Sequence, residues 1–347
     1  MGIPAKVLRD FYQRILLAVG TGEAEAAITA NALIDADLHG LETHGAMRIP
    51  PYIRVAKAGV IETGNKPKVE WRKGAVTLID GNNGWGQPAG MLAVEEVTAN
   101  ARKYSMGAVS IHNTNHIGTC AYYGRLLAKA GLVGFVTTNS PPNMPPTGGA
   151  EPVLGTNPIC FSAPASGGRV VVVDMATSVV AKGKILLAAQ RGESIPEGWA
   201  VDKDGRPTTD PQAAIGGNLL PVGGPKGYGL AMFADIFSGV LSGAAVAKNL
   251  NTMYSNDLKK SGVGAFMFGI DTSIFGAQDV SERMDELIAM VVGAKRAVGV
   301  EKIYLPGEIE EDKAKQRLAE GVSVSAPVLA NLNRTAAELG VAPLTEE

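Results

Sequence analysis

Short apolar runs alternate with helical patterns through the middle of the chain, and this alternation constrains the fold more than any other feature. Strands are predicted within 69–74, 75–87, 106–111, 132–139, 169–178 and 262–271. Helices are predicted at 88–105, 118–131, 178–191, 226–243 and 280–298. Such alternation predicts an α/β body, of the mixed α+β kind, in which helices cover a sheet.

The two ends of the chain carry helical patterns without strands. Helices are predicted at 5–19, 23–39, 51–58, 311–319 and 325–339. Residues 192–224 are rich in turn formers and are expected to be mostly loop. Because 347 residues are many for one core, we expect two domains: a helical domain of residues 1–70 with 310–347, and an α/β body over 71–309.

The charge balance excludes some partners. The chain has 32 basic and 34 acidic side chains and only 5% aromatic residues, so nucleic acid and anionic membranes are not expected as partners. The longest apolar stretch, GLAMFADIFSGVLSGAAVA, contains Asp235 and several glycines and favours a buried helix over a membrane span. Two cysteines outside any CxxC and an N-terminus without an apolar signal core favour a cytoplasmic protein.

Local nucleotide-binding signatures are absent from the sequence. No GxGxxG follows a predicted strand, since GTGEAE fails at its last position, and no GxxxxGK[ST] is present. A dinucleotide site in this chain would therefore have to be built in some other way.

Two of the four histidines lie in HGLETHGAMRIP, residues 39–50. If 44–48 formed one helical turn, His44 and Arg48 would share a face, and Pro50 is expected to end that turn. Arginine binds a carboxylate through two parallel N–H groups, and a nearby imidazole can exchange a proton with a hydroxyl on the adjacent carbon. The pair fits a small 2-hydroxy or 2-oxo acid, although the spacing alone favours two unrelated surface residues.

The other two histidines, His112 and His116, lie in IHNTNHIGT, where a predicted strand ends and a helix begins. Loops at strand ends often carry the chemistry of α/β proteins. Histidines four residues apart can bind zinc on a helix, but here an Asn-Thr-Asn loop separates them. We interpret His112 as a core or strand-end imidazole, and the residues alone leave His116 open between a structural and a functional role.

Seven segments together resemble, in this order, the type-2 malate/L-lactate dehydrogenase family: DLHGLETHGAMRIPPY, NTNHIGTCAYY, PTGGAEPVLGTNPI, VVVDMATSVVAKGKI, IPEGWAVDKDGRPTTDP, LLPVGGPKGYGLA and LPGEIEE. Each segment alone is ordinary, but the ordered set is specific and covers nearly the whole chain. The family includes ureidoglycolate dehydrogenase, sulfolactate dehydrogenase, 2,3-diketo-L-gulonate reductase and cyclic-imine carboxylate reductases.

The resemblance implies an oxidoreductase with a non-Rossmann fold that uses NAD or NADP on a small carboxylate substrate. It also implies a homodimer with the active site near the subunit interface. Residues 71–309 would then bind NAD(P) and dimerise, while 1–70 with 310–347 would contribute to the substrate site.

Site residues follow from the resemblance position by position. His116 is the expected general acid/base, and His44 is a second catalytic candidate. Arg48 and Tyr52 are expected to bind substrate, and no metal ligand is expected. Cofactor contacts are expected at Ser140, Asp174, Met175, Ala176, Lys226, Gly307, Glu308 and Ile309. The sequence departs from the family pattern at SPPNMPPTGG, where MAPFGG is more usual, which leaves the shape of the substrate side open.

Three rival interpretations remain at this point. The first is an NAD(P)H-dependent reductase of a cyclic imine carboxylate or a diketo sugar acid, which needs the same arginine and proton donor. The second is a metal-dependent hydrolase that uses some of the histidines, and the third is a non-catalytic binding protein. The sequence identifies neither the acid nor the choice between NAD and NADP.

Overall fold

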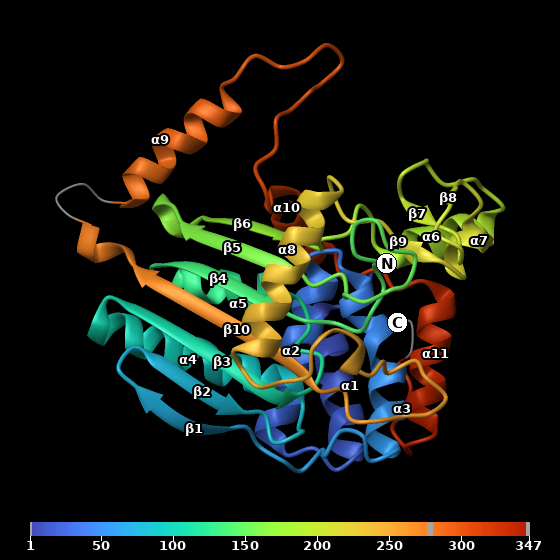
Figure 1. Cartoon of the computed structure of the whole chain (residues 1–347). Coiled ribbons are helices and arrows are strands. Elements are labelled where there is room, and N and C mark those ends of the chain that lie inside the picture. Colours follow the sequence, from blue (N-terminus) through green and yellow to red (C-terminus); the bar gives the residue numbers. More distant parts are fainter. Residues whose placement is uncertain (1, 276–279, 345–347) are drawn as a thin grey trace.

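The computed structural model describes residues 2–275 and 280–344. Over these ranges seven strands form one sheet in the order β1-β2-β3-β10-β4-β5-β6 (Figure 1). Their bounds are β1 Lys68–Lys73, β2 Val76–Asp80, β3 Met106–Thr114, β4 Leu132–Thr138, β5 Ile159–Pro164, β6 Val170–Met175 and β10 Val263–Asp271. Strands β2 and β3 run parallel, and the other neighbouring pairs are antiparallel.

This pairing confirms the mixed α/β fold and explains the missing glycine fingerprint. A Rossmann fold needs consecutive parallel strands joined by helical crossovers. Here the helix α4 (Gly86–Tyr104) joins the single parallel pair, β2 and β3, and its N-terminus has no GxGxxG.

The two faces of the sheet are covered by different helices. Because side chains alternate along a strand, β10 sends Ala265 and Met267 to one side and Phe266 and Phe268 to the other. The first side packs against α4 and α5 (Cys120–Lys129). The second side packs against α8 (Pro225–Asp235), which continues as a π-helical turn, η4 (Ile236–Val240), and crosses in front of the sheet in Figure 1.

The helical core draws on both ends of the chain. It contains buried residues of α1 (Ala5–Ala18), α2 (Glu23–Leu38), α3 (Ile49–Lys57) and α11 (Ala326–Ala337). A backbone bridge between Ile3 and Val322 joins the termini, and α10 (Glu308–Glu320) packs against α2. The proposed boundary at residue 70 stays a prediction, and strand β1 of the sheet already begins at Lys68.

A small unit with its own core lies between β6 and α8. It contains α6 (Lys182–Arg191), α7 (Pro211–Ile215) and a three-stranded sheet of β8 (Pro207–Thr208), β7 (Ala200–Val201) and β9 (Asn218–Leu219). The turn-rich segment 192–224 therefore folds into very short strands and one short helix, which are too short to give a periodic sequence pattern.

The prediction that Pro50 ends a helical turn is wrong. Residues 42–48 form two 3₁₀ turns, η1 (Glu42–His44) and η2 (Ala46–Arg48), with Gly45 between them. Ile49 is helical, with φ −56° and ψ −54°, and α3 begins there. The two prolines cost no hydrogen bond because N–H groups in the first turn have no intrahelical acceptor. The helix α9 (Val280–Val292) also ends earlier than the predicted residue 298.

Candidate active site

His44 and His116 lie side by side in the fold. His44 ends η1, His116 lies in the loop between β3 and α5, and their ring centroids are 5.5 Å apart. The other two histidines make structural contacts: His39 Nδ1 lies 2.7 Å from Asp35 O, and His112 Nε2 lies 2.8 Å from Glu70 Oε2. Each histidine cluster therefore supplies one imidazole to a common site.

Arg48 adds a positive charge beside the imidazole pair. Its Nη1 donates to the Tyr254 hydroxyl at 2.6 Å and lies 3.8 Å from Met253 Sδ, while its Nε is buried without a partner. Across residues 2–275 and 280–344, no carboxylate pairs with this guanidinium. A buried N–H donor on an unpaired cation leaves a place for an anionic ligand.

Both imidazoles are held neutral by their surroundings. Burial first, and the Arg48 charge second, lower the pKa of His44 from 6.5 to about 3. Burial, Arg48 and His44 likewise hold the pKa of His116 well below 6.5. The two side chains remain partly accessible at the chain surface. Partial access combined with strong desolvation is the property of groups that line a cleft.

Tyr52 contacts the imidazole of His116 from α3. The Tyr52 hydroxyl lies 2.7 Å from His116 Nδ1 and accepts a hydrogen bond from Gln87 Nε2 at 3.0 Å. Burial raises the pKa of Tyr52 to about 12, so its proton stays in place at neutral pH. The structure thus brings together four of the predicted site residues, namely His44, Arg48, Tyr52 and His116.

The turn that carries His44 is held by a buried carboxylate. Asp37 accepts hydrogen bonds from the Tyr12 hydroxyl at 2.7 Å and from the Ala46 backbone N–H at 2.9 Å. A side chain at Gly45 would overlap the Asp37 carboxylate, so this position requires glycine. Burial raises the pKa of Asp37 to about 7, partly offset by these donors.

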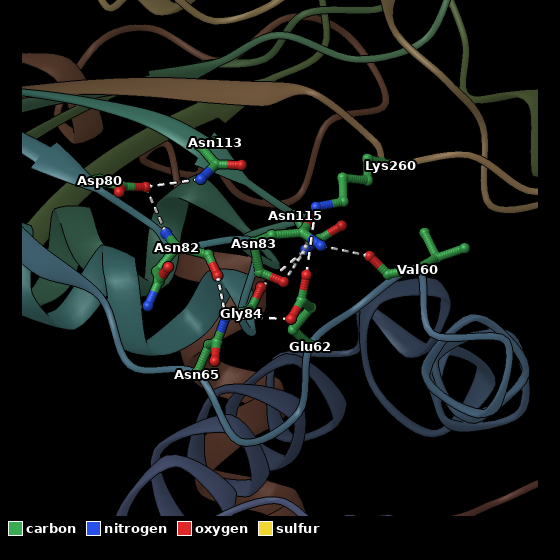
Figure 2. A network of polar contacts seen from close by, with 10 residues as sticks. All are labelled: Val60, Glu62, Asn65, Asp80, Asn82, Asn83, Gly84, Asn113, Asn115 and Lys260. Atoms are coloured by element: carbon green, nitrogen blue, oxygen red, sulfur yellow. Dashed lines mark hydrogen bonds and ion pairs between the residues drawn. The ribbon is translucent and has the colours of Figure 1, made fainter.

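The loop that carries His116 is held by a polar network of mostly amide groups, which also includes the Asp80 carboxylate and the Lys260–Glu62 ion pair (Figure 2). Asn115 is fully buried and donates from Nδ2 to Gly84 O at 2.8 Å, while its Oδ1 accepts from the Ser261 hydroxyl at 2.7 Å. Asn83 in turn donates to Val60 O at 2.9 Å. The network joins the turn after β2 to the end of β3, so His116 is fixed by contacts from distant parts of the chain.

The predicted cofactor residues lie on adjoining elements at one end of the sheet. Ser140 follows β4 and its N–H donates to Asn157 Oδ1 at 2.9 Å. Asp174 and Met175 end β6, and Ala176 follows. The next residue, Thr177, accepts a backbone hydrogen bond from the Val222 N–H. Val222 lies four residues before Lys226, which is exposed in the first turn of α8. Gly307 precedes α10, which begins with Glu308 and Ile309, and the Val172 N–H on β6 donates to Pro306 O.

The start of α8 has features that fit a phosphate of a dinucleotide. No side chain caps the first turn of α8, and Gly224 (φ 61°) has open space where a Cβ would be. Free N–H groups at a helix start together with the Lys226 ammonium suit a phosphate. Asp174 accepts from the Ala121 N–H at 2.8 Å and thereby ties β6 to the start of α5, and desolvation raises its pKa to about 6.

Residues outside the predicted set also shape the site. Gln87, Tyr254, Met253 and Asp37 contact predicted site residues or the turn that holds them. Asp37 lies inside the quoted first motif, but nothing in the sequence places Gln87 or Tyr254 beside it. Among the described residues no group of His, Cys, Asp and Glu is arranged to hold a metal ion, and no helix is long and apolar enough to cross a bilayer.

Comparison with known proteins places this chain in a class of 2-hydroxyacid-type oxidoreductases. The family model for malate/L-lactate dehydrogenase matches residues 3–333. The chain is 37% identical to malate dehydrogenase of Pyrococcus abyssi, over 98% of this chain and 95% of the relative. It is 35% identical to ureidoglycolate dehydrogenase (NAD(+)) of Escherichia coli, over 93% of each. It is 39% identical to (2R)-3-sulfolactate dehydrogenase (NADP(+)) of Chromohalobacter salexigens, over 75% and 78%.

Solved structures agree with the sequence relatives. Sulfolactate dehydrogenase of Methanocaldococcus jannaschii superposes with a TM-score of 0.92 at 35% identity, covering 99% of this chain and 98% of the other. Δ1-piperideine-2-carboxylate reductase of Pseudomonas syringae gives 0.89 at 30% identity, covering 97% and 100%. The chain therefore belongs to the malate/L-lactate dehydrogenase family, which confirms the resemblance seen in its motifs.

Proposed function

We propose that this protein is an NAD(P)-dependent dehydrogenase that interconverts a small 2-hydroxy acid and its 2-oxo acid. One observation carries the proposal: the unpaired Arg48 guanidinium lies beside two neutral imidazoles. An arginine binds the carboxylate, and a neighbouring imidazole serves the oxygen on the adjacent carbon.

Substrate binding would itself prepare the site for proton transfer. The Arg48 charge is one cause of the low pKa of His44 and His116. A substrate carboxylate on Arg48 offsets that charge, so the pKa values of both imidazoles rise toward their ordinary range. Acid/base chemistry at this pair would then be coupled to the presence of the acid.

The cofactor is NAD or NADP, and it supplies or accepts the hydride when bound. The residues proposed to hold it are Ser140, Asp174, Met175, Ala176, Lys226, Gly307, Glu308 and Ile309. The open start of α8 and the exposed Lys226 support a phosphate contact there. These residues orient the dinucleotide and Arg48 orients the acid, while Tyr52 acts on the acid through the imidazole of His116.

The relatives leave the acid open, because their names include malate, sulfolactate and ureidoglycolate dehydrogenases. A second candidate is reduction of a cyclic imine carboxylate, which the structural likeness to Δ1-piperideine-2-carboxylate reductase supports. An imine carboxylate presents the same carboxylate to Arg48 and a nitrogen in place of the oxygen.

We also propose that the protein forms a homodimer. The outer side of α8 and η4 exposes Met232, Ile236 and Val240, four residues apart, so that they form one apolar stripe. The helix α9 and the segment after it project from the body in Figure 1 and expose Leu287 and Met290 at 53% and 65%. Exposed apolar stripes of this kind favour a subunit contact, which sedimentation analysis would test. Buried free thiols at Cys120 and Cys160 favour a reducing, cytoplasmic setting.

The decisive experiment is a screen of NADH and NADPH oxidation. The substrates are oxaloacetate, pyruvate, sulfopyruvate, oxalurate, 2,3-diketogulonate and Δ1-piperideine-2-carboxylate. We expect turnover with a 2-oxo acid, and loss of that turnover in Arg48→Ala. Turnover only with the imine would favour the second candidate, and turnover with neither class would contradict the proposal. Titrating NADH and NADPH fluorescence against the wild type and Lys226→Ala tests the cofactor site separately.

A further inference from the structure

The hydrogen bonds around His116 determine which of its ring nitrogens carries the proton. The backbone N–H of Gly118 donates to His116 Nδ1 at 3.2 Å. A backbone N–H has no lone pair and cannot accept, so this contact favours Nδ1 as the unprotonated nitrogen of the ring. In a neutral imidazole the single proton then lies on Nε2.

Tyr52 and Gln87 reinforce this arrangement. Gln87 Nε2 donates to the Tyr52 hydroxyl at 3.0 Å, and that hydroxyl lies 2.7 Å from His116 Nδ1. With Nδ1 unprotonated through the Gly118 contact, the Tyr52 hydroxyl donates its hydrogen to Nδ1 and accepts from Gln87 on its oxygen. Tyr52 is 1% exposed and Gln87 is 0% exposed, so water does not compete for these bonds.

The other nitrogen of His116 is left for a ligand. Within the described part of the chain, Nε2 makes no hydrogen bond, and the His44 ring lies beside the His116 ring, with 5.5 Å between the ring centroids. The titratable groups that face His116 are Arg48, His44 and Tyr52. The positive charge of Arg48 disfavours protonation of His116 to an imidazolium. The Gly118 N–H, which points at Nδ1, disfavours a proton on that nitrogen.

His44 has a different environment. Its Nδ1 lies 3.0 Å from the Thr43 hydroxyl, which can rotate to donate or to accept. His44 can therefore take up or release a proton without breaking a fixed hydrogen bond.

We propose that Tyr52 and Gln87 are positioning residues that hold His116 as the Nε2–H tautomer, so that His116 donates a hydrogen bond to the reacting oxygen while His44 exchanges the proton. The inference rests on the proposed function for the identity of that oxygen. In oxidation, the hydroxyl proton of the substrate would pass to the free nitrogen of His44, while a nicotinamide, when bound, would take the hydride from the carbon. The resulting imidazolium then gives its proton to water, and His116 stays neutral throughout. A neutral imidazole in a desolvated site polarises a carbonyl without changing its own charge.

The test is nitrogen-15 NMR of histidine in the free enzyme, without cofactor or substrate. Four histidines give few signals, and single His→Gln variants assign them. We expect His116 to show a protonated Nε2 and an unprotonated Nδ1, without titration from about pH 5 to about pH 8. A protonated Nδ1, or titration near the ordinary pKa of histidine, would overturn the proposal.

Two variants test the positioning residues. Tyr52→Phe removes the hydroxyl, and Gln87→Met leaves that hydroxyl free to turn and accept from Nδ1. We expect both variants to show a mixture of His116 tautomers and to lower kcat roughly three- to tenfold, as for one lost hydrogen bond, with KM for the acid changed less. Both substitutions break the same series of hydrogen bonds, from Gln87 through Tyr52 to His116. Either variant alone therefore tests the proposal if the other does not fold.

Tyr123→Phe is the matched control. It removes a buried hydroxyl that bonds Ile117 O in the same loop without touching the ring. We expect it to lower stability and to leave the His116 tautomer unchanged. If all three variants keep a pure Nε2–H tautomer, Tyr52 and Gln87 have no positioning role. Because the NMR test uses no substrate, its failure is distinguishable from a failure of the substrate screen.

Discussion

The two segments that deliver the imidazoles are fixed by opposite kinds of chemistry. The His44 turn is fixed by the buried Asp37 carboxylate and by Arg317, which donates to Asp37 O and to Glu42 Oε1. The His116 loop is fixed by the neutral side chains of Asn115, Tyr52 and Gln87. The His44 turn therefore depends directly on charged groups, whereas the side chains that bond the His116 loop itself are amides and a phenol that do not ionise near neutral pH. The Asp80 carboxylate enters that network only through Asn82 and Asn113.

This difference matches the roles that we assign to the two rings. A hydrogen-bond donor of fixed tautomer needs surroundings that stay constant with pH, and neutral amides provide them. A proton-exchanging ring tolerates a charged setting, because its own charge changes during turnover. The comparison predicts that substitutions in the two segments will differ in the pH dependence of their effect on stability, as well as in the size of that effect.

The largest expected effect concerns the imidazoles. We expect His44→Ala to lower kcat by roughly 100- to 10,000-fold, the range for loss of a general acid/base. His116→Ala should also be severe, but His116→Gln should recover part of the loss because the amide still donates an N–H. The measurement is kcat at saturating cofactor, with melting temperatures to confirm folding. If His116→Gln is as inactive as His116→Ala, the proton exchange belongs to His116 instead.

The second effect concerns the pH dependence of stability. Burial raises the pKa of Asp37 from its ordinary value of 3.8 to about 7 in the folded chain. Between these values the folded state keeps a proton that the unfolded state releases, so the Asp37 contribution to stability is lost as pH rises through this window. Asp37→Asn has no such proton. We expect the difference in unfolding free energy, wild type minus variant, to fall between about pH 4 and about pH 7 by a few kcal/mol.

Urea denaturation at several pH values measures this difference. The matched control is Asn115→Ala, which should give a difference that is nearly independent of pH. A flat profile for Asp37→Asn would remove the electrostatic distinction between the two segments.

The third effect concerns the neutral network. Asn115→Ala leaves Gly84 O and the Ser261 hydroxyl without their partner in a buried place. We expect a loss of about 1–3 kcal/mol of unfolding free energy and a lower kcat, because the adjacent His116 loses its support. Unchanged stability together with unchanged kcat would show that the amides of Figure 2 do not fix the loop.

The smallest expected effect is that of Arg48→Lys. Lysine keeps the charge but cannot form the planar fork, so we expect KM for the acid to rise about tenfold or more, with kcat less affected. Arg72→Lys is the control, since Arg72 makes a two-pronged pair with Glu96 at the edge of the sheet, away from the site. Equal KM values in wild type and Arg48→Lys would remove Arg48 from the carboxylate site.

The sequence determined the features that depend on neighbours along the chain. The helical patterns at 5–19 and 23–39 correspond to α1 and α2 because burial on one face of a helix repeats every three or four residues. The run RVVVVDMATS likewise predicted strand β6, which has the polar residue Asp174 near its C-terminal end. The motifs also identified the family, and the four predicted residues His44, Arg48, Tyr52 and His116 do lie together.

Only the tertiary structure decided the features that depend on contacts between distant segments. The residues of a strand do not determine which strands it pairs with or in which direction, so the antiparallel neighbours of β10 could not be deduced from its pattern. The helical Ile49 before Pro50 is set by the packing of α3, which outweighs a local preference. Gly118, whose N–H bonds His116 Nδ1, lies in the same loop, but Tyr52, which also bonds Nδ1, and Gln87, which bonds Tyr52, come from two distant segments. The full set of contacts that we propose to fix the His116 tautomer therefore exists only in the folded chain.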